Sequence, residues 1–138
     1  MIVRNCAGGV VFFEDKVFLL KNEKGEWVFP KGIIRNGELP AEVAVKRVMD
    51  EGGIIAEIVS TGGDTSYEFY SISRQRPVCN RITWFIMRTG SDRFNILEKE
   101  KFTEGGFFNL EHALQLVTYS QDKALLNLSY KKYRELLS

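Results

Sequence analysis

Short apolar runs separated by polar turns dominate the first part of the chain, a pattern that predicts β-strands. Residues 6–13 (CAGGVVFF) and 16–20 (KVFLL) are rich in β-forming residues, and the Glu14-Asp15 pair between them predicts a hairpin. Residues 27–29 predict a further short extended segment, which Pro30 ends. The N-terminal part is therefore expected to be sheet.

The pattern changes to a helical period after residue 39. Pro40 suits the first position of a helix, because its missing N–H would have no partner there. Apolar residues then recur on one helical face, at Ala41, Ala44, Val45 and Val48. The glycine pair at 52–53 predicts the end of this helix.

The second half of the chain mixes strands and helices. Three β-like runs are expected at 54–60, 65–71 and 81–88, the last a central buried strand, and a short final strand at 105–109. Amphipathic helices are expected at 110–117 and 121–137. Because strands and helices do not alternate regularly, the pattern predicts an α+β fold with a mixed β-sheet between helices.

Composition limits the picture without naming a function. A chain of 138 residues suits one core, so a single domain spanning 1–138 is expected. Its net charge of +1 gives no strong field for nucleic acid or membrane, so an anionic ligand would need a local site. No apolar run is long enough to cross a bilayer. Two distant cysteines, Cys6 and Cys79, predict reduced thiols in a cytoplasmic protein.

Residues 32–54, which read GIIRNGELPAEVAVKRVMDEGGI, carry most of the functional information. Gly32 is followed after five residues by Glu38, and seven more residues lead to the run KRVMDEGGI at 46–54. This spacing resembles the signature of the Nudix hydrolases, whose corresponding run is Arg-Glu-aliphatic-x-Glu-Glu-x-Gly-aliphatic. The resemblance extends to residues 6–12, to WVFPKG at 27–32, and to 117–123, which is similar to members related to diadenosine polyphosphate hydrolases.

The resemblance implies a Nudix α/β/α sandwich with its signature box at 32–54. It also implies hydrolysis of nucleoside diphosphate-linked compounds by water activated on Mg²⁺ or Mn²⁺. On a helix, carboxylates three and four residues apart share a face and can converge on one metal ion. Glu51 is then the expected principal ligand, Asp50 a weaker one, and Glu38 a brace for the loop. The implied ligand is a small-molecule nucleotide or dinucleotide, and the oligomeric state stays open.

Three positions depart from the signature. Lys46 stands where the family has Arg, Arg47 where it has Glu, and Asp50 where it has Glu. At an effective dielectric of about 20, a unit charge about 6 Å from a divalent ion contributes roughly 5 kcal/mol. An inward-facing Arg47 should therefore weaken metal binding severely, whereas an Arg47 turned to solvent would not.

Other interpretations of these charged residues remain open. Arg47, Asp50 and Glu51 also fit a solvated helix face with ion pairs between neighbouring turns. Lys46 could pair with Glu38, although it lacks the planar fork of arginine. Outside the helix, Glu98, Glu100 and Glu104 lie in a region where Nudix enzymes often place a further metal-binding Glu. Glu100 and Glu104 are the candidates, and a solvated acidic loop is the alternative.

Aromatic and basic residues in the second half suggest a nucleotide contact. Tyr67, Phe69 and Tyr70 alternate along a predicted strand, with Arg74, Arg76 and Arg81 beyond it. Such residues could stack a purine and contact phosphates, with Tyr67, Arg81 and the upstream Lys31 as candidate substrate contacts. The alternative is a set of core aromatics beside a basic hairpin, with Lys31 on the surface.

Three functions follow as hypotheses. The first is a Nudix-type hydrolase with weakly bound metal and reduced activity, because Arg47 replaces a signature Glu. The second is a nucleotide-binding module in which Arg47 contacts phosphate directly and no hydrolysis occurs. The third is a protein-interaction module that uses the fold as a scaffold.

Overall fold

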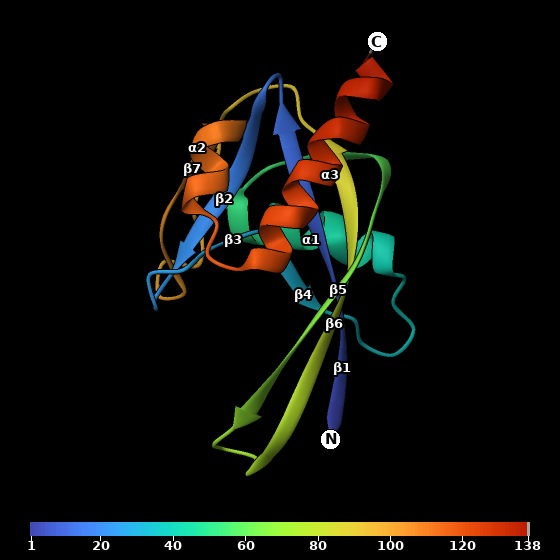
Figure 1. Cartoon of the computed structure of the whole chain (residues 1–138), viewed down its shortest axis with the longest axis vertical. Helices are drawn as coiled ribbons and strands as arrows, with labels where there is room; N and C mark the ends of the chain where they lie inside the picture. Colours follow the sequence, from blue (N-terminus) through green and yellow to red (C-terminus); the bar gives the residue numbers. More distant parts are fainter. Residues whose placement is uncertain (138) are drawn as a thin grey trace.

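The computed structural model describes residues 1–137 as one mixed seven-stranded sheet with helices on both faces (Figure 1). The path β3-β2-β1-β6-β5 runs through the sheet, β4 pairs with β1, and β7 pairs with β2. Only β1 and β6 pair in parallel, and the other strand pairs are antiparallel. In chain order the elements are β1 (Ile2–Phe13), β2 (Lys16–Asn22), β3 (Trp27–Val28), β4 (Lys31–Ile33), α1 (Pro40–Gly52), β5 (Glu57–Ser71), β6 (Arg76–Arg88), β7 (Phe102–Asn109), α2 (Leu110–Leu116) and α3 (Ser120–Leu137).

Alternation along the central strands produces two apolar layers. Val10 and Phe12 of β1 belong to the cluster that includes Leu126 of α3. The intervening Val11 belongs to a second cluster with Val48 of α1. Successive side chains of a strand point to opposite faces of its sheet, so α1 covers one face and α2 with α3 cover the other. This confirms the predicted α+β fold with a sheet between helices.

The signals at the two ends of α1 act as predicted. The helix begins at Pro40, and its C-cap residue Gly53 is left-handed, with φ of 63° and its N–H bonded to the Met49 carbonyl. The hairpin between β1 and β2 also forms, with Glu14 at a positive φ of 51°. No helix within residues 1–137 has the length and apolar character needed to cross a bilayer.

The predicted break between runs 54–60 and 65–71 is wrong. Glu57–Ser71 forms one strand, whose register against β6 shifts around Ser60 and again between Thr61 and Gly63. The glycines at 62–63 suggested a turn, but they are accommodated as irregularities inside the strand. The end of β5 and the start of β6, together with the start of β1, extend beyond the layered body as an arm (Figure 1).

Gly53 offers a test of how the helix end is held. A Cβ added there would lie 2.8 Å from the Asn95 carbonyl oxygen, whereas one added at Gly25, with φ of 80°, would meet open space. Left-handed backbone costs a non-glycine residue about 1–2 kcal/mol. We expect Gly25→Ala to cost about that much and Gly53→Ala distinctly more, as measured by urea unfolding. Equal costs would contradict the packing of Asn95 on the end of α1.

Candidate functional site

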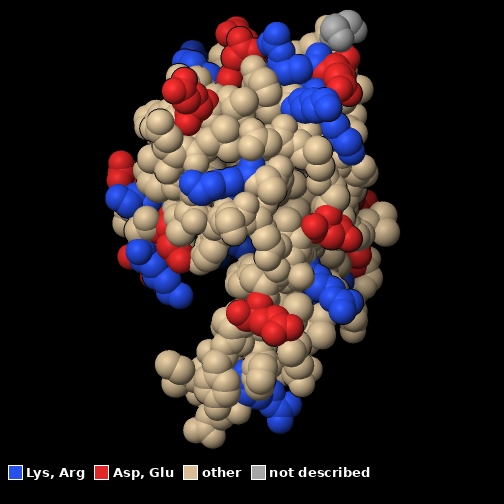
Figure 2. All heavy atoms as spheres, in the orientation of Figure 1, with Lys and Arg blue, Asp and Glu red and all other residues tan. Residues whose placement is uncertain are grey.

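A cleft of about 1150 Å³ opens where the arm meets the body. Six of its lining side chains are basic and two are acidic, which makes it the natural place for an anion. Figure 2 shows the notch between body and arm, with basic side chains beside it. The basic residues are Arg4, Lys24, Lys31, Arg35, Arg47 and Lys101, and the acidic ones are Glu23 and Glu51.

A buried ion pair forms the floor of this cleft. Arg47 and Glu51 lie one turn apart on α1, with Arg47 Nη2 2.6 Å from Glu51 Oε2. Glu51 is only 2% exposed, and its other oxygen accepts the Lys31 backbone N–H at 3.2 Å. The Arg47 stem crosses Gly32, where an added Cβ would lie 2.5 Å from Arg47 Cδ. The signature glycine therefore makes room for the arginine.

Further charges surround the pair. Arg47 also lies 3.7 Å from Asp50 and 3.4 Å from Glu98. Lys101 Nζ lies 3.5 Å from Glu51 and 3.6 Å from Glu98. Burial raises the pKa of the Glu51 carboxyl, and the neighbouring cations and the Lys31 N–H oppose that shift. Positive and negative groups thus alternate across the floor of the cleft.

This arrangement does not fit a divalent metal ion. Mg²⁺ prefers six oxygen ligands in near-octahedral geometry. Here the Arg47 guanidinium lies within 4 Å of Asp50, Glu51 and Glu98, where its N–H groups face the oxygens a metal would use. Within residues 1–137, no three His, Cys, Asp or Glu side chains are grouped so that they could share a metal. The positive charge next to these carboxylates comes from the Arg47 and Lys101 side chains.

The structure places the other acidic candidates away from this floor. Glu98 joins the cluster in place of the expected Glu100 and Glu104; Glu100 is exposed, and Glu104 pairs with Lys21 at 3.2 Å. Glu38 is exposed and accepts the Arg35 backbone N–H at 2.8 Å. The Glu38 carboxylate therefore bonds within its own loop.

The pairing considered for Lys46 is not formed among the described residues, and Arg81, the candidate phosphate contact, lies outside both cavities. Among residues 1–137, no ion pair joins Lys46 to Glu38. Arg81 is exposed on β6 opposite Ser66 and lines neither of the cavities described here. The sequence did not indicate which residues of this strand would face a cavity, so Arg81 could not be excluded beforehand.

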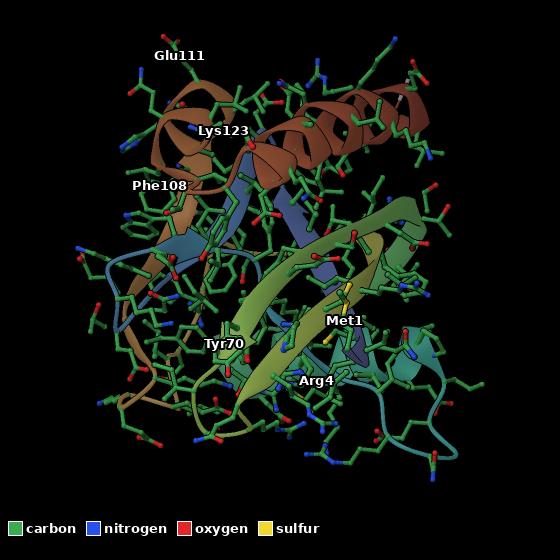
Figure 3. The ribbon with its side chains drawn as sticks, turned by 60° about the horizontal axis from the view of Figure 1, so that its bottom comes forward. Met1, Arg4, Tyr70, Phe108, Glu111 and Lys123 are labelled. Carbon is green, nitrogen blue, oxygen red and sulfur yellow. The ribbon has the colours of Figure 1, made fainter. Side chains whose placement is uncertain are left out.

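The arm supplies one wall of the cleft. Arg4, labelled in Figure 3, donates from Nε to Asn80 Oδ1 at 2.9 Å and lies over the Phe69 ring at 5.5 Å. Asn80 in turn donates to the Tyr67 hydroxyl at 2.9 Å. These bonds fix the position of Tyr67, a residue that the sequence singled out.

A second, aromatic cavity of about 530 Å³ adjoins the cleft and shares Lys31 and Tyr67 with it. The Tyr67 and Tyr119 rings stack with centroids 6.1 Å apart and planes 12° apart. Phe29 and Trp84 meet edge to face at 5.6 Å. The cavity therefore offers flat apolar walls to a planar group.

Asp122, in the first turn of α3, also lines the aromatic cavity. Burial raises the pKa of its carboxyl, and Lys31 partly opposes this effect. No side chain within residues 1–137 forms a hydrogen bond or ion pair with that carboxylate. The sequence showed that residues 117–123 resemble Nudix relatives, but it did not identify Asp122 or Tyr119 as site residues. Only the folded chain brings the start of α3 next to Phe29 and Trp84.

Comparison with known proteins gives a consistent result. A family model described as a NUDIX domain matches residues 2–128. The fold is similar to that of an Ap4A hydrolase from C. elegans, at 16% identity and a TM-score of 0.75, covering 96% of this chain and 98% of that one. It is also similar to the E. coli dihydroneopterin triphosphate pyrophosphohydrolase, at 15% identity and a TM-score of 0.74, covering 91% and 95%. An ADP-ribose pyrophosphatase from Streptococcus suis matches at 18% identity and a TM-score of 0.71, covering 95% and 92%.

Removal of the arginine tests the buried ion pair. Arg47→Ala leaves Glu51 buried without its closest partner, so we expect a loss of roughly 3 kcal/mol in the free energy of unfolding. The control is Arg88→Ala, which breaks an exposed pair with Glu57 and should cost less than about 1 kcal/mol. Urea unfolding gives both values. An Arg47→Ala cost as small as the control would show that Glu51 does not depend on Arg47.

Asp122 predicts a pH dependence of stability. Its pKa is raised above the ordinary value of 3.8, so over the interval between the two values the folded protein holds a proton that the unfolded chain has released. Stability should therefore fall as pH rises through that interval and stay level above it. In Asp122→Asn this fall should become smaller, with the remainder due to Glu51, whose pKa is also raised, whereas Asp92→Asn, at an exposed position, should keep the full fall. Identical pH profiles for the wild type and Asp122→Asn would contradict the burial of this carboxyl.

Proposed function

The chain belongs to the NUDIX domain family, and on this premise we propose that its cleft binds a nucleoside diphosphate-linked compound without needing a divalent metal. In this proposal residues 1–138 act as one domain, with the signature box at 32–54. The phosphates lie in the basic cleft and the base lies in the aromatic cavity. The observation that carries the proposal is the Arg47 guanidinium, which lies within 4 Å of the carboxylates of Glu51, in the cleft, and of Asp50 and Glu98 beside it.

The charge balance of the cleft supports a phosphate ligand. Its lining has six basic side chains against two acidic ones, while the whole chain has a net charge of only +1. Arg4, Lys31 and Lys101 reach the cleft from three different segments, so a bound diphosphate would meet positive charge from several sides. Arginine and lysine provide charge-assisted hydrogen bonds to phosphate oxygens without a metal ion.

The aromatic cavity supports a base at the other end of the ligand. Both cavities share Val28, Phe29, Lys31 and Tyr67, so one molecule can extend from one to the other. Stacking of a base on aromatic side chains is worth roughly 1–3 kcal/mol. The proteins of similar fold are named for substrates such as Ap4A, ADP-ribose and dihydroneopterin triphosphate, which fits a ligand with a planar ring and several phosphates.

Weak phosphoanhydride hydrolysis is a second candidate, because the chain belongs to a family of hydrolases. Nudix hydrolases generally use divalent metals such as Mg²⁺, so this activity would require a metal ion in the cleft. One observation favours it. Asp50, Glu51 and Glu98 all lie within 4 Å of the same guanidinium, so a rotation of the long Arg47 side chain would leave these carboxylates without it, and they would have to move closer together to share a metal ion. That rotation would break the buried pair with Glu51. We therefore propose that Mg²⁺ binds weakly and that any turnover is slow.

Thermal unfolding with and without a chelator tests the proposal. We expect pyrophosphate and nucleoside diphosphates to raise the melting temperature equally in EDTA and in Mg²⁺, because the positive charge comes from side chains. A ligand present at about 100 times its dissociation constant stabilises the folded state by about 2.7 kcal/mol. Stabilisation that vanishes in EDTA, together with phosphate release in Mg²⁺, would favour the hydrolase instead.

Arg47→Glu is the matched variant for the metal. It replaces the central cation by a carboxylate beside Asp50, Glu51 and Glu98, so we expect it to lower the melting temperature without metal. Mg²⁺ should then restore stability to this variant and leave the wild type unchanged. Arg88→Glu makes the same charge reversal away from the cleft and should show no response to Mg²⁺. If Mg²⁺ does not change the melting temperature of Arg47→Glu, position 47 does not adjoin the metal site that the family signature implies.

A further inference from the structure

Asp122 is the acidic side chain that lines the aromatic cavity, and within residues 1–137 no side chain forms a hydrogen bond or ion pair with its carboxylate. A carboxylate that is largely removed from water without a hydrogen bond is costly, so such groups tend to occur where a ligand completes them. Lys31 is the charged group shared by the cavity and the cleft. A ligand that meets Asp122 would therefore have its phosphates directed towards Lys31.

Several other polar groups of the cavity already have partners. Trp84 donates its indole N–H to the Thr65 hydroxyl at 2.8 Å. Gln121 uses both ends of its amide on the Ser66 backbone, at 2.6 and 3.1 Å. The Tyr119 hydroxyl donates to Glu26. Among the described residues that line the cavity, Asp122 is thus the carboxylate whose hydrogen-bonding capacity is left for a ligand.

The chemistry of a carboxylate selects the matching edge of a base. An ionised carboxylate only accepts hydrogen bonds, and its two oxygens suit two parallel N–H donors. Guanine presents two such donors side by side, the ring N1–H and the exocyclic 2-amino group. Hypoxanthine lacks the amino group, and adenine places its amino group beside a ring nitrogen that accepts.

We infer that Asp122 determines base specificity by accepting the N1–H and 2-amino hydrogen bonds of a guanine held in the aromatic cavity. The inference rests on the proposed function for the phosphate half of the ligand. The cavity opens to solvent beside the cleft, and the Tyr67–Tyr119 and Phe29–Trp84 pairs provide flat walls for a purine. Asp122 is accordingly a specificity-determining residue at the base.

Calorimetric titration in EDTA with GDP, IDP, ADP and pyrophosphate tests this inference. A hydrogen bond to a charged group corresponds to about tenfold in affinity or more, so GDP should bind about tenfold more tightly than IDP, and ADP more weakly than GDP. In Asp122→Asn one acceptor becomes a donor, so the preference for GDP over IDP should disappear. Pyrophosphate affinity should be the same in both proteins, because it does not reach Asp122.

Controls separate specificity from folding and from phosphate binding. Asp92→Asn makes the same substitution at an exposed position and should keep the GDP preference. Asp122→Asn should melt no lower than the wild type, because it removes a desolvated charge. Equal affinities of the wild type for GDP, IDP and ADP, or tightest binding of ADP, would overturn the inference while leaving the phosphate site intact. If pyrophosphate fails to bind, the proposed function fails, and ligand-observed NMR with guanosine then decides whether Asp122 alone still recognises the base.

Discussion

The buried pair between Arg47 and Glu51 is the interaction on which the site depends. Glu51 is almost fully buried, and an ionised carboxylate in that position requires a cation. Arg47 supplies it at 2.6 Å and at the same time contacts Glu98, while the second Glu51 oxygen takes the Lys31 N–H. The pair therefore joins α1, β4 and the segment before β7 through one network. In a protein with three carboxylates at these positions a metal ion would make those connections, and here a side chain makes them.

The fold explains why a charged cleft and an apolar cavity lie next to each other. Alternation along the strands divides the side chains between the α1 face and the face covered by α2 and α3. The cleft includes Arg47 and Glu51 of α1, whereas the cavity includes Trp84 and residues at the start of α3. Lys31 and Tyr67 belong to both. A ligand with phosphates at one end and a ring at the other matches this division, and Asp122 lies on the side of the ring.

The parts of the fold that the sequence predicted are those set by local signals. Pro40 and Gly53 mark the ends of α1 because a proline first turn and a left-handed glycine cap act within a few residues. The division of strand side chains between the two sheet faces follows in the same way from the period of two along a strand. The pairing of Arg47 with Glu51 follows from their spacing of one helical turn. The contact of Arg47 with Glu98 spans 51 positions of sequence, and no pattern in either segment indicates it. The aromatic cavity likewise forms only when residues near 29, 67, 84 and 122 pack together, so Asp122 could not be identified beforehand.

In the proposed function a side-chain cation, rather than a metal ion, neutralises Asp50, Glu51 and Glu98. Crystals grown with a guanine or adenine nucleoside diphosphate and soaked in Mn²⁺ test it most directly, because anomalous scattering locates manganese independently of any refinement. We expect no manganese at Glu51, an intact Arg47–Glu51 contact, and phosphate oxygens bonded to basic side chains of the cleft. Manganese bound to Glu51 together with Asp50 or Glu98, with the Arg47 side chain turned out to solvent, would show that a metal ion and not Arg47 neutralises these carboxylates.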